Sequence, residues 1–187
     1  MLPAGIERHR FDVAEYHRML EAGVLSEDHR VELIGGEIVD MTPIGRSHLS
    51  CVVALTHLLV MAAGGRCYVS VQNAIRLGPS DEPQPDISLI RTHPELDAEG
   101  PPGSDEVLSV IEVGDTSLAY DRDVELPLYA RAGISEVWIV DLRGRKVGVY
   151  AGPASGGYGV YRTAGPGEQL SSETVEGLSL SVDEVLR

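Results

Sequence analysis

Residues 106–141 read EVLSVIEVGDTSLAYDRDVELPLYARAGISEVWIVD, and this stretch decides the fold. Residues 106–113 and 137–141 are short apolar runs rich in Val and Ile, which predicts strands buried on both faces of a sheet. Residues 118–132 lie between them and have helical spacing. Pro127 should kink that helix, because proline lacks the backbone N–H of an internal hydrogen bond. A strand, a helix and a second strand in this order predict a sheet covered by helices.

Patterns outside this stretch extend the prediction. Asp12 and Glu15 have the spacing of a capping box at the start of a helix that runs to about Glu21. A Gly-Gly pair inside residues 30–41 predicts a tight hairpin. Other segments have clear helix or strand periodicity: helices over 47–63 and 182–186, and strands over 67–77, 85–91, 146–150 and 158–162. The predicted fold class is therefore α/β (α+β), a mixed β-sheet flanked by helices.

Length and composition limit the possible functions. The 187 residues suit a single domain over 1–187, of which 1–10 and 165–187 are predicted to be peripheral. A net charge of −14 argues against a protein that coats DNA, but not against an enzyme with one basic groove. We expect no membrane segment and no signal peptide, hence a cytoplasmic protein. Cys51 and Cys67 lack CxxC spacing and are expected to be core thiols.

Two carboxylates are the strongest candidates for chemistry. Asp86 begins one predicted strand and Glu112 stands near the end of another, 26 positions later along the chain. Adjacent strands can bring both to one edge of the sheet, where carboxylate oxygens suit magnesium. On spacing alone the pair is also compatible with a strand cap and a solvated strand end. The apolar neighbours of Glu112 argue for a buried carboxylate, which is costly unless it is paired or binds a metal.

Four segments carry a resemblance to a known family. They are VELIGGEIVDMTPIGRSH (31–48), PQPDISLI (83–90), VIEVGDTSLAYDRDVELPLYARAGISEVWIVDL (110–142) and KVGVY (146–150). Together they resemble the Uma-two family of restriction endonucleases, within the PD-(D/E)XK nuclease superfamily, from about Phe11 to Tyr161. The resemblance implies a restriction-endonuclease-like core and a metal-dependent endodeoxyribonuclease that hydrolyses DNA. It also implies Mg²⁺ or Mn²⁺ as cofactor, and nuclease folds that pair subunits suggest a homodimer.

The resemblance also assigns roles to residues. Asp86 matches the PD aspartate, and with Glu112 and the main-chain carbonyl of Val113 it would hold the metal ion. Glu32 matches a further acidic position, as a third ligand or an orienting group.

Substrate-binding roles fall on four other residues. His48 matches a frequent family histidine, and Gln72 precedes the strand of Asp86. Arg122 lies one turn before Glu125 on the predicted helix, where it could supply positive charge to a substrate. Tyr129 lies four residues after Glu125 and is expected either to line the substrate groove or to pack in the core.

The superfamily's lysine is missing. Gly114 stands two residues after Glu112, and Glu125 holds the position at which the family usually has lysine. In one interpretation Glu125 is a third catalytic carboxylate and the enzyme is active. In the other, the added negative charge impairs the site, and the chain is a non-enzymatic binding or assembly module with a nuclease fold.

Overall fold

The computed structural model describes residues 7–26, 29–41, 43–92 and 100–187. Its elements follow the chain in this order: α1 (Val13–Glu21), β1 (Val31–Ile34), β2 (Glu37–Asp40), α2 (Arg46–Ala63), β3 (Cys67–Val71), β4 (Ile87–Arg91), β5 (Val107–Gly114), α3 (Leu118–Tyr120), η1 (Asp121–Glu125), α4 (Leu126–Arg131), β6 (Glu136–Asp141), β7 (Lys146–Ala154), β8 (Gly157–Ala164), β9 (Gln169–Ser171), β10 (Ser179–Ser181) and α5 (Val182–Val185). Residues 1–6 of the predicted peripheral segment lie outside the described residues, as do residues 93–99 between the two candidate acids.

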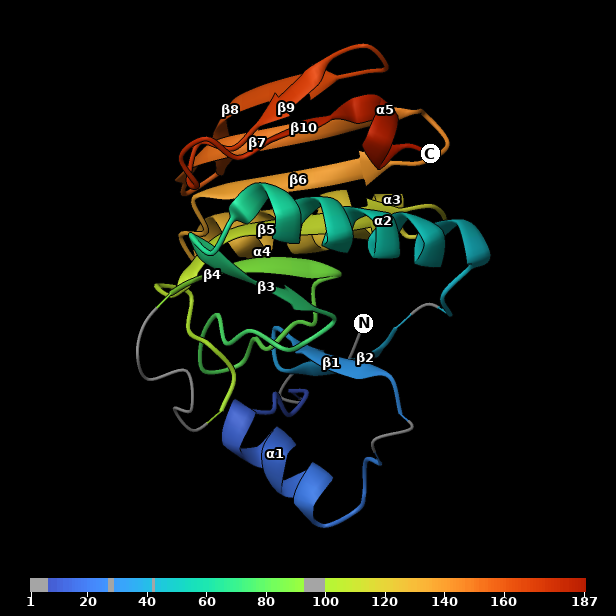
Figure 1. Cartoon of the computed structure of the whole chain (residues 1–187). Helices are drawn as coiled ribbons and strands as arrows, with labels where there is room; N and C mark the ends of the chain where they lie inside the picture. Colours follow the sequence, from blue (N-terminus) through green and yellow to red (C-terminus); the bar gives the residue numbers. More distant parts are fainter. Residues whose placement is uncertain (1–6, 27–28, 42, 93–99) are drawn as a thin grey trace.

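A six-stranded sheet forms the centre of the molecule, in the order β3-β4-β5-β6-β7-β8 (Figure 1). Neighbouring strands are antiparallel, except that β5 and β6 are parallel. Parallel neighbours need a crossover connection, which here consists of α3, η1 and α4. The prediction of a mixed sheet flanked by helices is confirmed.

Helical elements cover the two faces of the sheet. Helix α2 packs on one face together with α5 and the β9–β10 ribbon, and the crossover covers the other face (Figure 1). Burial of both faces explains why the central strands are continuous apolar runs. Cys51 and Cys67 are buried free thiols, as predicted.

The prediction that residues 165–187 are peripheral is wrong. This segment buries seven apolar side chains in the core beneath α2: Leu170, Val175, Leu178, Leu180, Val182, Val185 and Leu186. Its two strands have three residues each, too few to identify from the sequence, whereas the helix predicted over 182–186 is present as α5.

The predicted kink at Pro127 takes the form of a wider turn. Segment η1 is π-helical, and the N–H of Leu126 donates to the carbonyl of Asp121, five residues earlier. Proline cannot donate, and in an α-helix its ring would clash with the carbonyl four residues earlier. The extra residue in the turn removes this conflict and lets Pro127 stand in the first turn of α4, which begins at Leu126.

The N-terminal elements lie beyond the β3–β4 side of the sheet (Figure 1). Helix α1 has the predicted capping box between Asp12 and Glu15. The β1–β2 turn has Gly35 and Gly36 at φ of 57° and 73°, a conformation that favours glycine. Val13, Tyr16, Val31 and Leu33 form a separate small core that fixes the hairpin. The hairpin thereby presents Glu32 toward the sheet.

Among the described residues, α2 is the one helix long and apolar enough to cross a membrane by length and composition. One of its sides packs into the sheet core through residues such as Leu55 and Leu59. Core helices of this kind pass the same test. Its other side exposes Leu49, Val53 and Val60.

Replacement of Leu55 by Ala should lower the free energy of unfolding by about 2–5 kcal/mol, because Leu55 is fully buried and the change leaves a cavity. Val53→Ala is the matched control on the same helix, since Val53 is 62% exposed; its effect should stay within about 0.5 kcal/mol. Urea unfolding of both variants measures the difference. Equal losses in the two variants would contradict the assigned orientation of α2.

Candidate functional site

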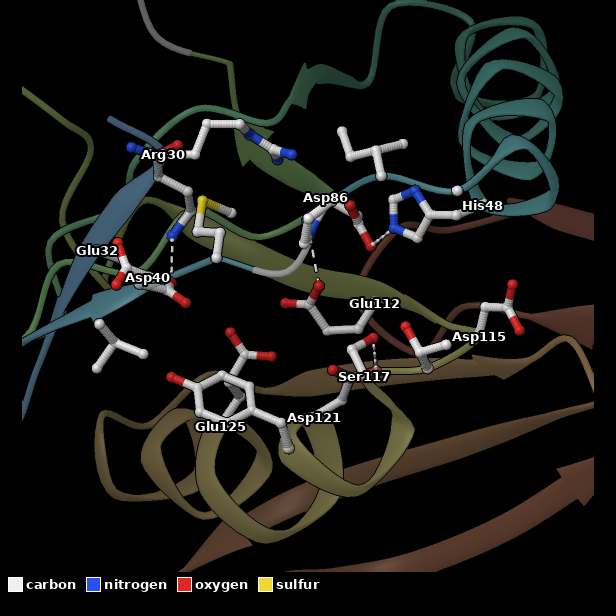
Figure 2. A pocket seen from close by; sticks show the side chains of 18 of the residues that line it. Arg30, Glu32, Asp40, His48, Asp86, Glu112, Asp115, Ser117, Asp121 and Glu125 are labelled. Atoms are coloured by element: carbon white, nitrogen blue, oxygen red, sulfur yellow. Dashed lines mark hydrogen bonds and ion pairs between the residues drawn. The ribbon is translucent and has the colours of Figure 1, made fainter. Parts of the chain in front are cut away.

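Asp86 and Glu112 are joined where the β4–β5 ladder ends. The N–H of Asp86 donates to Oε2 of Glu112 at 3.1 Å, and the N–H of Val113 donates to Oδ2 of Asp86 at 2.9 Å. The predicted meeting of both acids at one edge of the sheet is therefore what the structure shows (Figure 2). Glu112 is 5% exposed, which agrees with the buried strand expected from its neighbours.

The carbonyl of Val113 faces the same side as Asp86. The N–H and C=O groups of one strand residue point to the same side, and the Val113 N–H points to Asp86. Val113 also lies beyond the last pair of the β4–β5 ladder, Ile87 with Ile111. This orientation is the one that the predicted ligand role of the carbonyl requires.

His48 and Gln72 orient the carboxylate of Asp86. Nε2 of His48, in the first turn of α2, lies 2.8 Å from Oδ2, and Nε2 of Gln72 donates to Oδ1 at 3.4 Å. Gln72 has a φ of 52°, which is uncommon for a residue other than glycine. This conformation ends β3 at Val71, so the predicted strand over 67–77 was too long. The hydrogen bond to Asp86 raises the pKa of His48.

Tyr129 lies beneath Glu112 and not in a substrate groove. It is fully buried in α4, and its hydroxyl donates to Oε1 of Glu112 at 2.6 Å. Burial raises the pKa of the Tyr129 phenol well above its usual value, so it remains a donor. The predicted substrate contact is therefore wrong, because a buried phenol supports Glu112 from inside the protein.

A cavity of about 490 Å³ opens above the two acids. The β1–β2 hairpin, the start of α2, the end of β5 and the α3–η1 segment form its walls. Its lining carries seven carboxylates, from Glu32, Asp40, Asp86, Glu112, Asp115, Asp121 and Glu125. The basic side chains in the lining are those of Arg30 and His48 (Figure 2). The cavity therefore has a strongly negative potential.

Burial raises the pKa of four of these carboxyls. It is the largest cause of a pKa of about 7 for Glu32 and about 6 for Asp121, and the neighbouring acids add to it. The pKa values of Glu112 and Glu125 are raised well above their usual range for the same reasons. At neutral pH the cavity must therefore hold protons or bind cations.

Glu125 is the least compensated acid of the cavity. Its side chain is 6% exposed, and among the described residues no hydrogen bond or ion pair reaches its carboxylate. Figure 2 shows this carboxylate pointing into the cavity. Burial of a charge without a partner is costly, so Glu125 favours a bound cation or a proton.

Asp121 is a site residue that the sequence analysis missed. Its carboxylate lines the cavity and accepts a hydrogen bond from the Ser117 hydroxyl at 3.2 Å. The available signal was its position four residues before Glu125, which places both on one helix face. Wide η1 turns keep both side chains directed to the cavity.

Arg122 does not line the cavity, so its predicted substrate contact there is wrong. Its Nη2 lies 3.6 Å from Oδ2 of Asp141, at the end of β6. The residue follows Asp121 on η1, and successive helical side chains point in different directions. Among the arginines of the described residues, Arg30 is the one that lines the cavity.

Packing at Gly114 explains the missing lysine. A Cβ at this position would lie 2.8 Å from Cδ1 of Leu118 and 2.9 Å from Oδ2 of Asp121. Both atoms are the ends of side chains that can shift, but the Cα of Leu118 would lie only 3.0 Å away, so α3 would also have to give way slightly. The route of the backbone after β5 therefore disfavours a side chain two residues after Glu112.

The donor set fits a hard cation, although the cavity contains no complete set of ligands. Among residues 7–26, 29–41, 43–92 and 100–187, no three His, Cys, Asp or Glu side chains form a group that could hold a metal ion. Magnesium usually takes one or two carboxylates and completes its shell with water and substrate phosphate. Asp86 and Glu112 with the Val113 carbonyl meet that requirement, and the uncompensated Glu125 provides the negative charge.

Comparisons with known proteins identify the family and the fold. The Uma2 family model, described as "Putative restriction endonuclease", matches residues 13–183. The chain is also similar to the crystal structure of "a putative nuclease belonging to DUF820" from Anabaena variabilis, with a TM-score of 0.71 and 14% identity over 94% of this chain and 97% of that chain. At this identity the similarity shows the fold. No curated protein matches the chain.

Stability of the metal-free protein should fall as pH rises from about 4.5 to about 7, the ordinary and folded pKa values of Glu32. A raised folded pKa means that the native state keeps a proton that the unfolded state has released, so each rise in pH favours unfolding. His48 acts in the same direction, because its pairing with Asp86 is lost above its raised pKa. Glu125→Gln should flatten this dependence and raise the melting temperature at pH 8 by at least about 3 °C. Melting curves in EDTA across this pH range measure both effects; a wild type that gains stability up to pH 8 would contradict the assigned repulsion.

Gly114→Ala should lower the free energy of unfolding by about 1–3 kcal/mol through overpacking against α3 and η1. Gly156→Ala is the control, because nothing lies within 4 Å of the Cβ that it would add. Denaturant unfolding compares the two. Unchanged stability of the Gly114 variant would show that the chain can accommodate a side chain there.

Proposed function

Since the chain belongs to the Uma2 family of restriction-endonuclease-like proteins, we propose that it is a divalent-metal-dependent endonuclease that hydrolyses DNA phosphodiester bonds at this cavity. The observation that supports the proposal most is the joined pair of Asp86 and Glu112 under a cavity rich in carboxylates. The negative charge of such a site favours bound cations, and a divalent cation also promotes the hydrolysis of a phosphodiester.

Asp86 and Glu112 would hold the ion with the carbonyl of Val113. We propose Mg²⁺, or Mn²⁺ in its place, because all of these donors are oxygens. When bound, the ion neutralises charge on the scissile phosphate and lowers the pKa of an attacking water. The family typically uses divalent metals, which is consistent with this choice.

Neighbouring residues hold the two acids in place. His48, Gln72 and the Val113 N–H fix the carboxylate of Asp86, and Tyr129 fixes Glu112 from below. Both carboxylates are therefore already ordered, so binding of a metal ion does not have to restrict their side chains. This is what a preorganised site requires.

Glu32 is the best candidate for a proton acceptor. Its Oε2 accepts from the N–H of Gln84 at 3.1 Å, and its side chain lines the cavity. Its pKa of about 7 suits a general base near neutral pH. Glu125, in place of lysine, would act as a third carboxylate that increases the affinity of the cavity for cations.

A second candidate function follows from a different observation. Both oxygens of Asp86 are engaged by protein donors, and the described residues contain no complete group of metal ligands. A non-enzymatic binding module with a nuclease fold would show the same features. The predicted homodimer, the cytoplasmic location and the single-domain organisation remain predictions.

Calorimetric titration of Mg²⁺ and Mn²⁺, with cleavage of plasmid and oligonucleotide DNA, tests the proposal. Asp86→Ala should reduce cleavage at least about a hundredfold and remove the binding heat, because changes even outside the ligand shell reduce metal affinity or activity by about 10–100-fold. Asp123→Asn is the matched control, since Asp123 is an exposed acid of η1 outside the cavity lining. It should bind metal and cleave as the wild type does.

Three outcomes separate the candidates. Loss of both activities in Asp86→Ala alone supports the endonuclease. Cleavage by Asp86→Ala at the wild-type rate would refute the assigned site. A folded wild type that neither binds millimolar metal nor cleaves DNA would favour the binding module.

A further inference from the structure

A second surface lies next to the cavity and takes no part in the proposed reaction. Its side chains come from one face of β7 and β8. Alternation along β7 places Lys146, Gly148 and Tyr150 on one face of the sheet, and Tyr161 of β8 lies directly opposite Tyr150. We call Tyr150, Tyr161, Lys146 and the nearby Arg122 the tyrosine surface.

The two tyrosine rings of this surface are arranged as a platform. Their centroids are 4.8 Å apart with an interplanar angle of 30°, so the rings are in contact and tilted relative to each other. A Cβ on Gly148 would lie 3.1 Å from the Tyr150 ring and 3.4 Å from the Tyr161 ring, so the missing side chain lets both rings lie against the sheet. Tyr161 is 56% exposed, which is high for an aromatic side chain without a partner molecule.

Positive charge gathers beside this platform. Lys146 begins β7, and the β6–β7 turn before it carries Arg143; Arg145 of the same turn instead donates to the carbonyl of Leu186 in the α5 layer. Arg122 lies between Asp141 and the phenol of Tyr150. Burial raises the pKa of this phenol, and the positive charge of Arg122 opposes the rise. Its Nε is buried without a hydrogen-bond partner in the described part of the chain. In a chain of net charge −14, aromatic rings beside such a cluster suit a polyanion with exposed aromatic bases.

The tyrosine surface begins at the end of the sheet where the cavity opens: Lys146 pairs with Asp141, the last residue of β6, and Tyr150 lies four residues further along β7. Asp121 faces the cavity, while the next residue, Arg122, faces the tyrosine surface. Asp115 lines the cavity and accepts a hydrogen bond from Nε of Arg143 at 2.8 Å. A chain that leaves the cavity across this end therefore meets the basic turn and then the two rings.

We propose that the tyrosine surface binds unpaired nucleotides of the DNA strand whose phosphodiester occupies the cavity. The proposal rests on the proposed function, since it extends the substrate of the same site. Unpaired bases expose their faces and can stack on tyrosine, whereas bases within a duplex cannot. Lys146 and Arg122 contact the backbone phosphates between the stacked bases. The enzyme therefore selects single-stranded DNA, or duplex DNA with a frayed or flapped strand.

Binding of a fluorescent oligo(dT) and of a duplex of equal length, by anisotropy in EDTA, tests this proposal without cleavage. Tyr161→Leu should weaken oligo(dT) binding roughly 5- to 150-fold, because leucine fills space but cannot stack as an aromatic ring does. Tyr161→Phe should bind as the wild type does. Val160→Ala is the matched control, since Val160 is exposed on the same strand but points to the opposite face.

Salt dependence tests the charged part of the surface. Lys146→Ala should reduce the slope of log affinity for oligo(dT) against log salt concentration by about 0.7, the value for one phosphate contact on a single strand. Light scattering on each variant records its oligomeric state, and melting curves establish that it is folded.

The results decide the proposal independently of catalysis. Oligo(dT) binding that Tyr161→Leu loses and that Tyr161→Phe and Val160→Ala keep supports it, even if no cleavage occurs. Wild-type affinity in Tyr161→Leu, or no oligo(dT) binding by the wild type, overturns it while leaving cleavage of duplex DNA possible. A change of oligomeric state in Tyr161→Leu would also overturn it, because the rings would then contact a second copy of the chain.

Discussion

Two reciprocal hydrogen bonds at the end of β4 and β5 determine how the rest of this molecule is arranged. Asp86 donates its N–H to Glu112 and receives the N–H of Val113, so each acid occupies a place that a ladder hydrogen bond would otherwise fill. The ladder can stop inside the protein without leaving buried backbone donors unsatisfied. The acids thus replace main-chain pairing at the point where the sheet opens into a cavity.

Each layer of the fold contributes one donor to this pair. Helix α2 supplies His48, the left-handed residue after β3 supplies Gln72, and α4 on the opposite face supplies Tyr129. A shift of Gln72 or of Tyr129 leaves Oδ1 of Asp86 or Oε1 of Glu112 without its donor, which costs about 1–3 kcal/mol or more, whereas Oδ2 of Asp86 keeps the N–H of Val113 if α2 shifts. The same contacts that hold the layers in register therefore also orient the acids.

The fold was predictable because its sequence signals are local. Much of the site was not predictable, because it depends on how deeply side chains are buried in the folded protein. Apolar runs around Glu112 identified the buried strands, and the Gly-Gly pair identified the hairpin. Arg122 and Tyr129 were misplaced because helix spacing gives a direction but not the depth of a side chain in the core. Asp121 was missed because the sequence does not show the π-helical turn before Pro127, which directs the Asp121 side chain to the cavity. The C-terminal segment was undervalued because its two strands have only three residues each.

The crowding around Gly114 limits how this protein can change over generations. A side chain two positions after Glu112 crowds α3, so a basic residue there needs α3 to give way at the same time. Glu125 lines the cavity, and its carboxylate already points into it (Figure 2). A change of charge at position 125 therefore alters the site with less disturbance of the backbone than the same change at position 114.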